Sequence, residues 1–101
     1  MTEQPLMPGY DEGGIYQLRL FVTGASPNST RAILNLKKIC EEFLKERYEL
    51  EIIDIYQQPL MAQAEQIIAV PMLIKKGPGV ERRLIGDMSN KEKVLRGLGL
   101  S

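Results

Sequence analysis

The stretch AVPMLIKKGPGVERRLIGDMSNKEKVL, residues 69–95, decides the fold of this 101-residue chain. Two segments within it, residues 70–75 and 80–85, have the composition of extended strands. Between them stand Lys76, Gly77, Pro78 and Gly79, where the glycines permit a positive φ and the proline fixes a turn. The stretch therefore predicts an antiparallel hairpin, in which Pro71 lies just inside the first arm.

The end of the same stretch predicts a capped helix. Gly86 and Asp87 close the second arm of the hairpin, and Ser-Asn-Lys-Glu follows at residues 89–92. This spacing matches a capping box, in which Ser89 and Glu92 satisfy each other's exposed backbone N–H groups. The apolar positions of the final helix are Val94, Leu95 and Leu98.

Upstream of the hairpin the pattern predicts a strand, a helix and a second strand. Residues 15–22 and 49–56 are the strands, and a helix between two strands favours a parallel crossover pair. Ser26 is expected to cap the helix, with Pro27 at its first position. One apolar stripe of the helix should face the sheet: Ala32, Ile33, Leu36, Ile39, Cys40, Phe43 and Leu44.

A short helix from Pro59 to about Ile68 completes the predicted elements, with Ala64, Ile67 and Ile68 as its inner side. The order is then β-α-β-α-β-β-α, in the α/β class. We expect one domain over residues 15–101. Residues 1–14 hold two prolines, three glycines and no apolar periodicity, which predicts a flexible N-terminal arm.

Composition excludes several functions. With 13 basic and 13 acidic side chains the formal charge is zero, which argues against nucleic-acid binding. The longest apolar run is far below the roughly 20 residues that cross a membrane, and no secretory signal is visible, so a cytoplasmic location is expected. With no histidine and one cysteine, neither a zinc site, nor an intramolecular disulfide, nor histidine general-base catalysis is available. We expect no cofactor, no metal and no enzymatic activity.

The element order, with its proline beside the last hairpin, resembles a thioredoxin-like domain, in which that proline is normally cis. Redox members of this fold place Cys-x-x-Cys at the start of the first helix, where this chain has Ser-Pro-Asn-Ser at residues 26–29. Ser26 and Ser29 thus occupy a degenerate Cys-x-x-Cys position, and alcohols cannot form a disulfide. Cys40 lies in the apolar stripe, which favours a buried hydrophobe over a reactive thiol.

A more specific resemblance rests on several stretches of sequence: YQLRLFVTG at residues 16–24, SPNS at 26–29, ID at 53–54, the Pro71 segment and, above all, RRLIGDMSNKEKVL at 82–95. Together they resemble the KaiB family over residues 16–100. The resemblance implies a non-enzymatic protein that binds the N-terminal ring of KaiC, a hexameric double-ring ATPase, and modulates its phosphorylation and ATPase cycle. It also implies a SasA-like kinase as competitor.

The resemblance further implies a metamorphic protein, with a thioredoxin-like form and an alternative β-α-β-β-α-α-β form that is typically tetrameric. Familiar clock members carry three prolines where this chain has Gly77-Pro78-Gly79, and the glycines favour the hairpin of the thioredoxin-like form. Gly86 and Asp87 are the expected fold-switch residues, because the two folds need this turn in different conformations. The number of subunits, with a dimer or a tetramer as the forms considered, stays open.

A partner is expected to dock where residues 26–29 meet Pro71, at the carboxyl end of the parallel strands. The short helix should contribute side chains to this surface, including an exposed methionine that adapts to a partner: Leu60, Met61, Gln63 and Gln66. A mixed-charge surface supplies further contacts or is simply solvated: Lys37, Lys38, Lys75, Lys76, Arg82 and Arg83. Glu49 and Glu51 stand where clock members have a small residue and a lysine used against KaiA, so KaiA binding is disfavoured.

Two other functions compete with this interpretation. The first is a stress-response adaptor or sensor domain that holds a peptide on the same thioredoxin-like surface without redox activity. The second is a redox enzyme that works through Cys40, which the apolar setting of that residue disfavours.

Overall fold

A computed structural model describes residues 14–100 of the chain. The predicted N-terminal arm, residues 1–14, lies outside the described residues apart from Gly14. The elements follow in the predicted order β-α-β-α-β-β-α: β1 (Tyr16–Val22), α2 (Pro27–Phe43), β2 (Tyr48–Asp54), α3 (Pro59–Ala64), β3 (Met72–Gly77), β4 (Arg82–Ile85) and α4 (Lys91–Leu98). The alternative β-α-β-β-α-α-β order is not the one this structure adopts.

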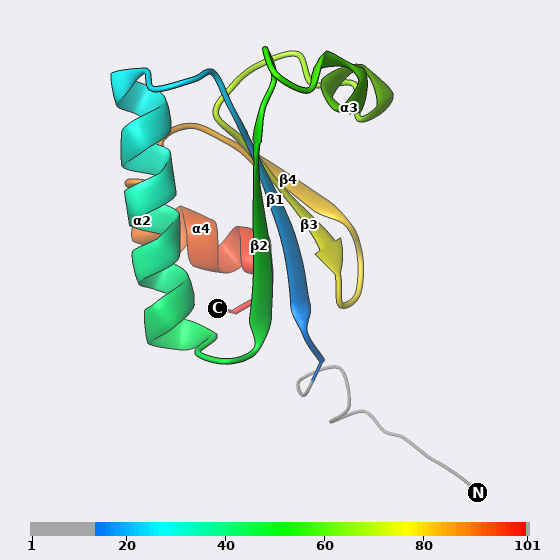
Figure 1. Cartoon of the computed structure of the whole chain (residues 1–101). Helices are drawn as coiled ribbons and strands as arrows, with labels where there is room; N and C mark the ends of the chain where they lie inside the picture. The colour runs from blue at the N-terminus through cyan, green and yellow to red at the C-terminus, as the bar shows by residue number, and fades with distance from the viewer. Residues whose placement is uncertain (1–13, 101) are drawn as a thin grey trace, which may run out of the picture.

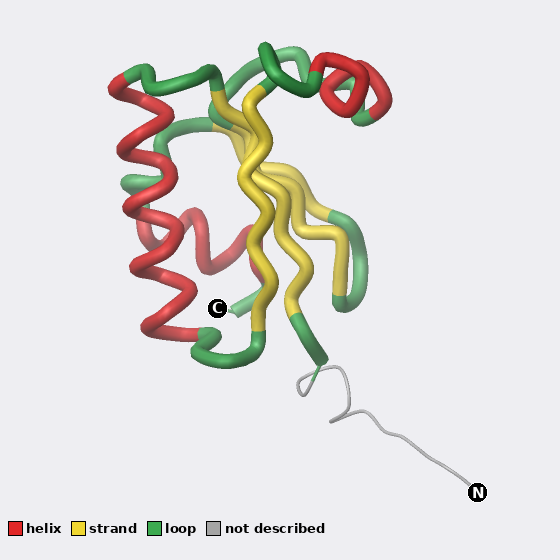
Figure 2. The backbone as a smooth tube through the Cα atoms, viewed as in Figure 1, coloured by secondary structure: helices red, strands yellow, loops and turns green. Residues whose placement is uncertain are grey.

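The four strands form one sheet in the order β2-β1-β3-β4. β1 pairs in parallel with β2, as the crossover through α2 predicts, and antiparallel with β3. β3 and β4 form the predicted antiparallel hairpin. Helices α2 and α4 cover one face of the sheet, and the short α3 lies on the other side near one end (Figures 1 and 2).

Side chains of each strand alternate between two hydrophobic cores, because successive residues point to opposite faces of a sheet. On the face covered by α2 and α4, Leu18, Leu20 and Val22 join the larger core. On the other face Phe21 joins a smaller core with Ile53, Met72 and Ile74, against which part of the α3 segment packs.

Helix α2 begins as predicted and buries most of the predicted stripe. Ser26 is the N-cap, its side chain accepting from the Ser29 N–H, and Pro27 is the first helical residue. Two members of the stripe are not buried: Ile33 is partly buried, and the Phe43 side chain is 38% exposed and lies under the Lys91 ammonium, 5.0 Å from the ring centroid. The buried members are Ala32, Leu36, Ile39, Cys40 and Leu44.

Helix α3 is shorter than the predicted span to Ile68. It ends at Ala64, because Gln66 takes a left-handed conformation with φ 57° and turns the chain back toward β3. The predicted inner side is therefore wrong in part: Ala64 is exposed and Ile68 is 89% exposed, whereas Ile67 packs on the smaller core.

The capping box before α4 is also wrong. The N-cap is Asn90, whose side-chain oxygen accepts from the Lys93 N–H at 3.1 Å. Ser89 instead belongs to the preceding turn, where its N–H donates to Asp87 Oδ1 at 3.1 Å. The carboxylate of Asp87 thus displaces the cap by one residue along the chain.

The hairpin arms are shifted relative to the predicted ones. β3 runs from Met72 through Gly77, and β4 begins only at Arg82, which leaves Val80 in the loop and 72% exposed. The strand ends differ from the prediction because a turn that contains glycines can begin and end at more than one residue.

Helix α4 crosses β4 at very close range. A methyl group built on Gly97 would lie 2.7 Å from Leu84 Cγ and 2.9 Å from Leu84 Cδ2, inside van der Waals contact. Glycine at position 97 is therefore what lets α4 settle on the hairpin. Within residues 14–100, none of the helices combines the length and the apolar composition needed to span a bilayer.

Candidate docking surface

The start of α2 and the segment before β3 form one groove, as the sequence predicts. Its volume is about 300 Å³, and the Val70–Pro71 peptide bond in its wall is cis. The residues that line the groove are Thr23, Ser26, Pro27, Asn28, Val70 and Pro71. The degenerate Cys-x-x-Cys position and the proline therefore meet at the carboxyl end of β1.

The two serines of this position form a small hydrogen-bond network. The Ser26 hydroxyl donates to Ser29 Oγ at 2.8 Å, and Ser29 Oγ also accepts from the Thr23 N–H at 3.0 Å. The Ser29 N–H donates to Ser26 Oγ at 3.2 Å, and Ser29 is fully buried. Both hydroxyls thus hold the β1–α2 turn in place, which is a structural role.

Cys40 lies far along α2 from this groove and is fully buried. Burial, with a smaller contribution from Glu41, raises the pKa of Cys40 to about 12. Burial and the raised pKa both keep the thiol protonated at neutral pH, which disfavours a nucleophilic role. Among residues 14–100, no cluster of three or more His, Cys, Asp or Glu side chains is placed to hold a metal ion.

The α3 segment presents polar and apolar side chains to solvent. Leu60 is 77% exposed, and Gln63 and Gln66 are also exposed, so these three predicted positions are available to a partner. Met61 is not exposed as predicted: it is half-buried and packs on the smaller core. Its place in the helix turns it inward, where it helps to hold α3 on the sheet.

The sequence does not predict the exposure of two apolar side chains beside α3. Tyr56, just after β2, is 76% exposed, and Ile68 is 89% exposed. The helical period, continued past Ala64, assigns Ile68 to the inner side of the helix and so predicts burial. Tyr56 ends a strand-like apolar run, so the pattern predicts burial for this residue too.

The turn at Gly86 and Asp87 is held by α2 in an unusual backbone conformation. Gly86 has φ 128° and the buried Met88 has φ 62°, both on the left-handed side that favours glycine. Asn35 Nδ2 donates to the Asp87 carbonyl at 2.9 Å, and Arg31 Nε lies 3.4 Å from Asp87 Oδ2. Hydrogen bonds from Ser89, with a smaller contribution from Arg31, lower the pKa of the Asp87 carboxyl.

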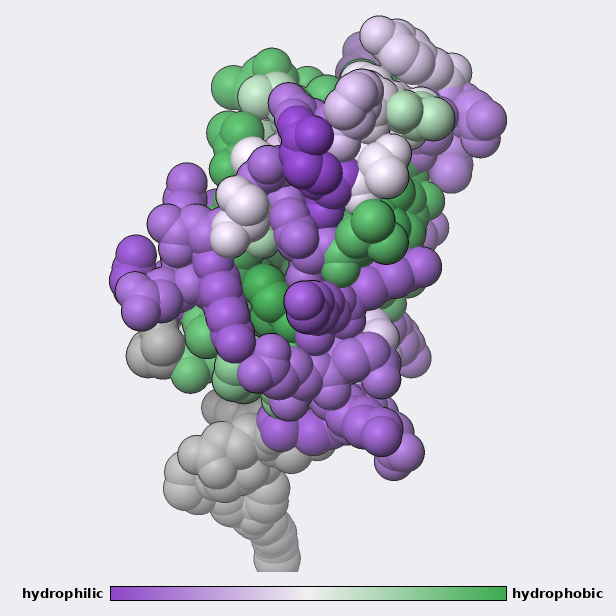
Figure 3. Space-filling view, turned by 90° about the vertical axis from the view of Figure 1, so that its left-hand side faces the viewer, coloured by the Kyte–Doolittle hydropathy of each residue, from purple (hydrophilic) through white to green (hydrophobic). Residues whose placement is uncertain are grey.

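The predicted basic surface divides into exposed, buried and paired cations. Lys37 and Lys38 are exposed on the solvent side of α2, a face that is mostly hydrophilic (Figure 3). The prediction that Lys75 lies on this surface is wrong. Lys75 is only 6% exposed, and its ammonium donates to the Pro78 carbonyl at 2.8 Å under the hairpin loop. Burial, and to a lesser degree the charge of Arg82, lowers the pKa of Lys75.

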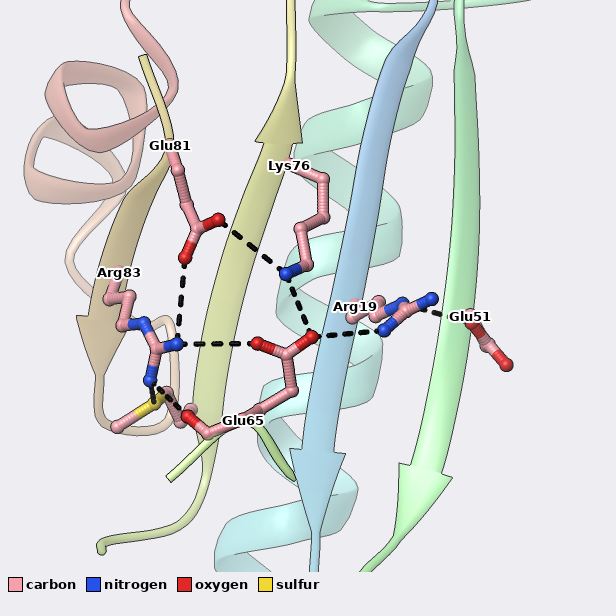
Figure 4. A network of polar contacts seen from close by, with 7 residues as sticks. Arg19, Glu51, Glu65, Lys76, Glu81 and Arg83 are labelled. Atoms are coloured by element: carbon pink, nitrogen blue, oxygen red, sulfur yellow. Dashed lines mark hydrogen bonds and ion pairs between the residues drawn. The ribbon is translucent and has the colours of Figure 1, made fainter. Parts of the chain in front are cut away.

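Lys76 and Arg83 are paired, because both reach the carboxylate of Glu65 on the face of the sheet opposite α2 (Figure 4). A hydrogen bond from Lys76 is the main cause that lowers the pKa of Glu65, so this carboxylate stays ionised at neutral pH. Neither of these two cations is a freely solvated charge.

Comparison with known proteins matches the chain to the KaiB family. The KaiB domain family matches residues 19–100. The circadian clock protein KaiB3 of Synechocystis sp. is 51% identical over 83 residues, which cover 82% of this chain and 81% of the relative. The circadian clock oscillator protein KaiB of Prochlorococcus marinus is 48% identical over 85 residues, covering 84% of this chain and 79% of the relative.

Solved structures show the thioredoxin-like fold. The N-terminal domain of SasA from Synechococcus elongatus superposes with a TM-score of 0.70 at 22% identity, covering 100% of this chain and 93% of that domain. Mitochondrial thioredoxin 3 from Saccharomyces cerevisiae gives a TM-score of 0.69 at 14% identity, covering 90% and 83%. These structures show the thioredoxin-like fold. Because the KaiB domain family matches residues 19–100, this protein belongs to the KaiB family.

Proposed function

We propose that this protein is a non-enzymatic binding partner of a KaiC-like hexameric ATPase, which it contacts on the N-terminal ring and whose phosphorylation and ATPase cycle it modulates. Membership of the KaiB family supports the kind of partner. The observation that carries the docking site is the exposure of large apolar side chains on and beside α3: Tyr56, Leu60 and Ile68. Apolar side chains of this size are common anchors of protein interfaces.

Leu60→Glu should weaken binding to the purified, ATP-loaded KaiC homologue encoded in the same genome by at least about tenfold, because a carboxylate would replace an apolar anchor. Leu34→Glu is the matched control, since Leu34 is 63% exposed on α2, away from the proposed surface. Isothermal titration calorimetry of the parent and both variants measures the effect. Unchanged affinity in Leu60→Glu, with binding lost on charge reversal of Lys37 and Lys38, would place the interface on α2 instead.

We further propose that Gly86 and Asp87 control a balance between this fold and the alternative β-α-β-β-α-α-β form. The φ of 128° at Gly86 supports this role, because any side chain at this position disfavours the turn that the thioredoxin-like form needs. The hold of α2 on Asp87, through Asn35 and Arg31, supports it in the same way.

Gly86→Ala and Asp87→Arg should therefore both raise the population of the alternative form. In NMR spectra, helical shifts should replace strand shifts over residues 75–84, and size-exclusion chromatography should show a larger species. Gly24→Ala is the control, since Gly24 also has a positive φ (51°) but lies in the β1–α2 turn. Spectra and elution volumes that match the parent in both test variants would contradict the switch role.

The groove between residues 26–28 and Pro71 supports a second candidate, an adaptor or sensor domain that holds an extended peptide without redox activity. Purification of the protein from its native host separates the two functions. Recovery of the KaiC homologue supports the ring partner, and recovery of a different client in its absence supports the adaptor.

A further inference from the structure

The carboxylate of Glu65 forms ion pairs with side chains from three strands, on the face of the sheet opposite α2 (Figure 4). Glu65 Oε2 lies 2.7 Å from Lys76 Nζ and 3.1 Å from Arg19 Nη1, and Glu65 Oε1 lies 3.3 Å from Arg83 Nη2. We call Glu65 with Arg19, Lys76 and Arg83 the Glu65 clamp. Arg19 belongs to β1, Lys76 to β3 and Arg83 to β4, so the clamp spans three neighbouring strands.

Glu65 is also held by its main chain. Arg83 Nη1 donates to the Glu65 carbonyl at 2.7 Å, while the other amino group of the same guanidinium meets the side-chain carboxylate. Glu65 is the C-cap residue of α3, where carbonyl groups lack helical partners. Arg83 therefore binds the end of the helix through two separate groups.

Few other contacts fix the position of α3. The helix has six residues, none of them buried, and its N-cap Gln58 makes no side-chain capping hydrogen bond. Apolar packing of the segment on the smaller core comes from Met61 and Ile67, both only partly buried. A helix this short is not stable by itself, so it depends on tertiary contacts.

The clamp is better shielded from water than an ordinary surface ion pair. The Glu65 side chain is 15% exposed, against 29% for Lys76, 35% for Arg19 and 36% for Arg83. Partial removal from water strengthens the attraction between charges, and a network of pairs contributes more than isolated pairs do. Glu81 is a peripheral member, 3.5 Å from both Lys76 and Arg83, and it makes no contact with α3 among the described ion pairs.

We infer that Glu65 is the positioning residue of the docking surface: the clamp holds α3 against the sheet and so sets where Leu60 and Gln63 meet a partner. The contacts described above support the first part, that the clamp holds α3 against the sheet. The consequence for binding rests on the proposed function.

Glu65→Gln tests the inference, with Glu81→Gln as a matched control that removes the same charge from the same network. Amide hydrogen exchange over residues 61–67, followed by NMR, should become at least about tenfold faster in Glu65→Gln and stay within about twofold of the parent in Glu81→Gln. Exchange in β1 and β3 should change little in either variant. Equal exchange over residues 61–67 in the two variants would overturn the inference.

Lys76→Gln is a second variant, which removes the shortest pair and keeps Glu65; it should give an intermediate acceleration. Raising NaCl from about 0.05 M to about 0.5 M should likewise speed exchange over residues 61–67 in the parent and less in Glu65→Gln, because salt screens the clamp. Salt-independent exchange in the parent would contradict a role for charge.

Calorimetric titration of the KaiC homologue then separates the inference from the proposed function. Weaker binding by Glu65→Gln than by Glu81→Gln supports the positioning role. If the parent binds the ring and Glu65→Gln binds it equally well despite faster exchange in α3, the positioning role is overturned. If the parent itself does not bind the ring, the proposed function fails, and the exchange data alone decide whether the clamp holds α3.

Discussion

Gly97→Ala should destabilise the protein by about 1–3 kcal/mol, the usual cost of overpacking a well-packed contact. The sign is opposite to that expected in an open helix, where alanine is more favourable than glycine by up to about 1 kcal/mol. The reason is the close crossing of α4 over β4, where the new methyl group would lie 2.7 Å from Leu84 Cγ. Urea unfolding followed by circular dichroism measures the change.

A double-mutant cycle shows whether Leu84 is the cause. In a Leu84→Ala background the clash is absent, so Gly97→Ala should become neutral or stabilising. Gly99→Ala is the control: its φ of 79° makes alanine unfavourable, but a methyl group there meets no atom within 4 Å, so its cost should be the same in both backgrounds. A Gly97→Ala cost that persists without the Leu84 side chain would contradict the packing argument.

Ser26→Cys with Ser29→Cys should give the chain a redox-active disulfide that the parent lacks. The two hydroxyl oxygens already lie 2.8 Å apart, so sulfur atoms at these positions are within reach of a bond of about 2.0 Å. The start of α2 also favours a thiolate at position 26. Thiol titration of the unfolded protein should find one free thiol after oxidation, that of Cys40, and three after reduction.

The catalytic consequence is measured by insulin reduction with dithiothreitol. The double variant should accelerate the reaction, whereas the parent should match dithiothreitol alone because the thiol of Cys40 is buried and protonated. Ser26→Cys with Ser29 retained is the control, since the other cysteine, Cys40, is buried near the far end of α2 and out of reach of residue 26. Three free thiols in the oxidised double variant would show that residues 26 and 29 are not arranged as a redox pair.

Local sequence signals predict the order of elements and the start of α2 well. Ser26 and Pro27 act within one turn of the helix, and the glycines near Pro78 act within one hairpin, so short windows of sequence contain the causes. Errors arise where a distant group competes with a local one. The Asp87 carboxylate takes the Ser89 N–H and moves the cap to Asn90. Helix α3 ends early at the left-handed Gln66, next to the Glu65 carboxylate that pairs with cations of the sheet.

The docking surface is predictable only in outline. The meeting of residues 26–29 with Pro71 follows from strand order, because the carboxyl ends of parallel strands share one edge of the sheet. Met61 packs on the smaller core although Ala64, one helical turn further on, is exposed, so the inner side of α3 is set by where the helix meets the sheet and not by its own pattern. In the Glu65 clamp, Arg19 and Glu65 are 46 positions apart in the sequence, and charge alone does not say which of the chain's basic side chains a carboxylate will meet.

The Glu65 clamp also has an uneven tolerance to mutation. Three cations share one anion, so a change at Arg19, Lys76 or Arg83 leaves two partners for Glu65. Loss of the carboxylate instead leaves three positive side chains facing one another, and among the described residues the peripheral Glu81 and Glu51 are the acidic groups that pair with them. We therefore expect a substitution at any one of the three cationic positions to loosen α3 less than loss of the carboxylate at position 65 does.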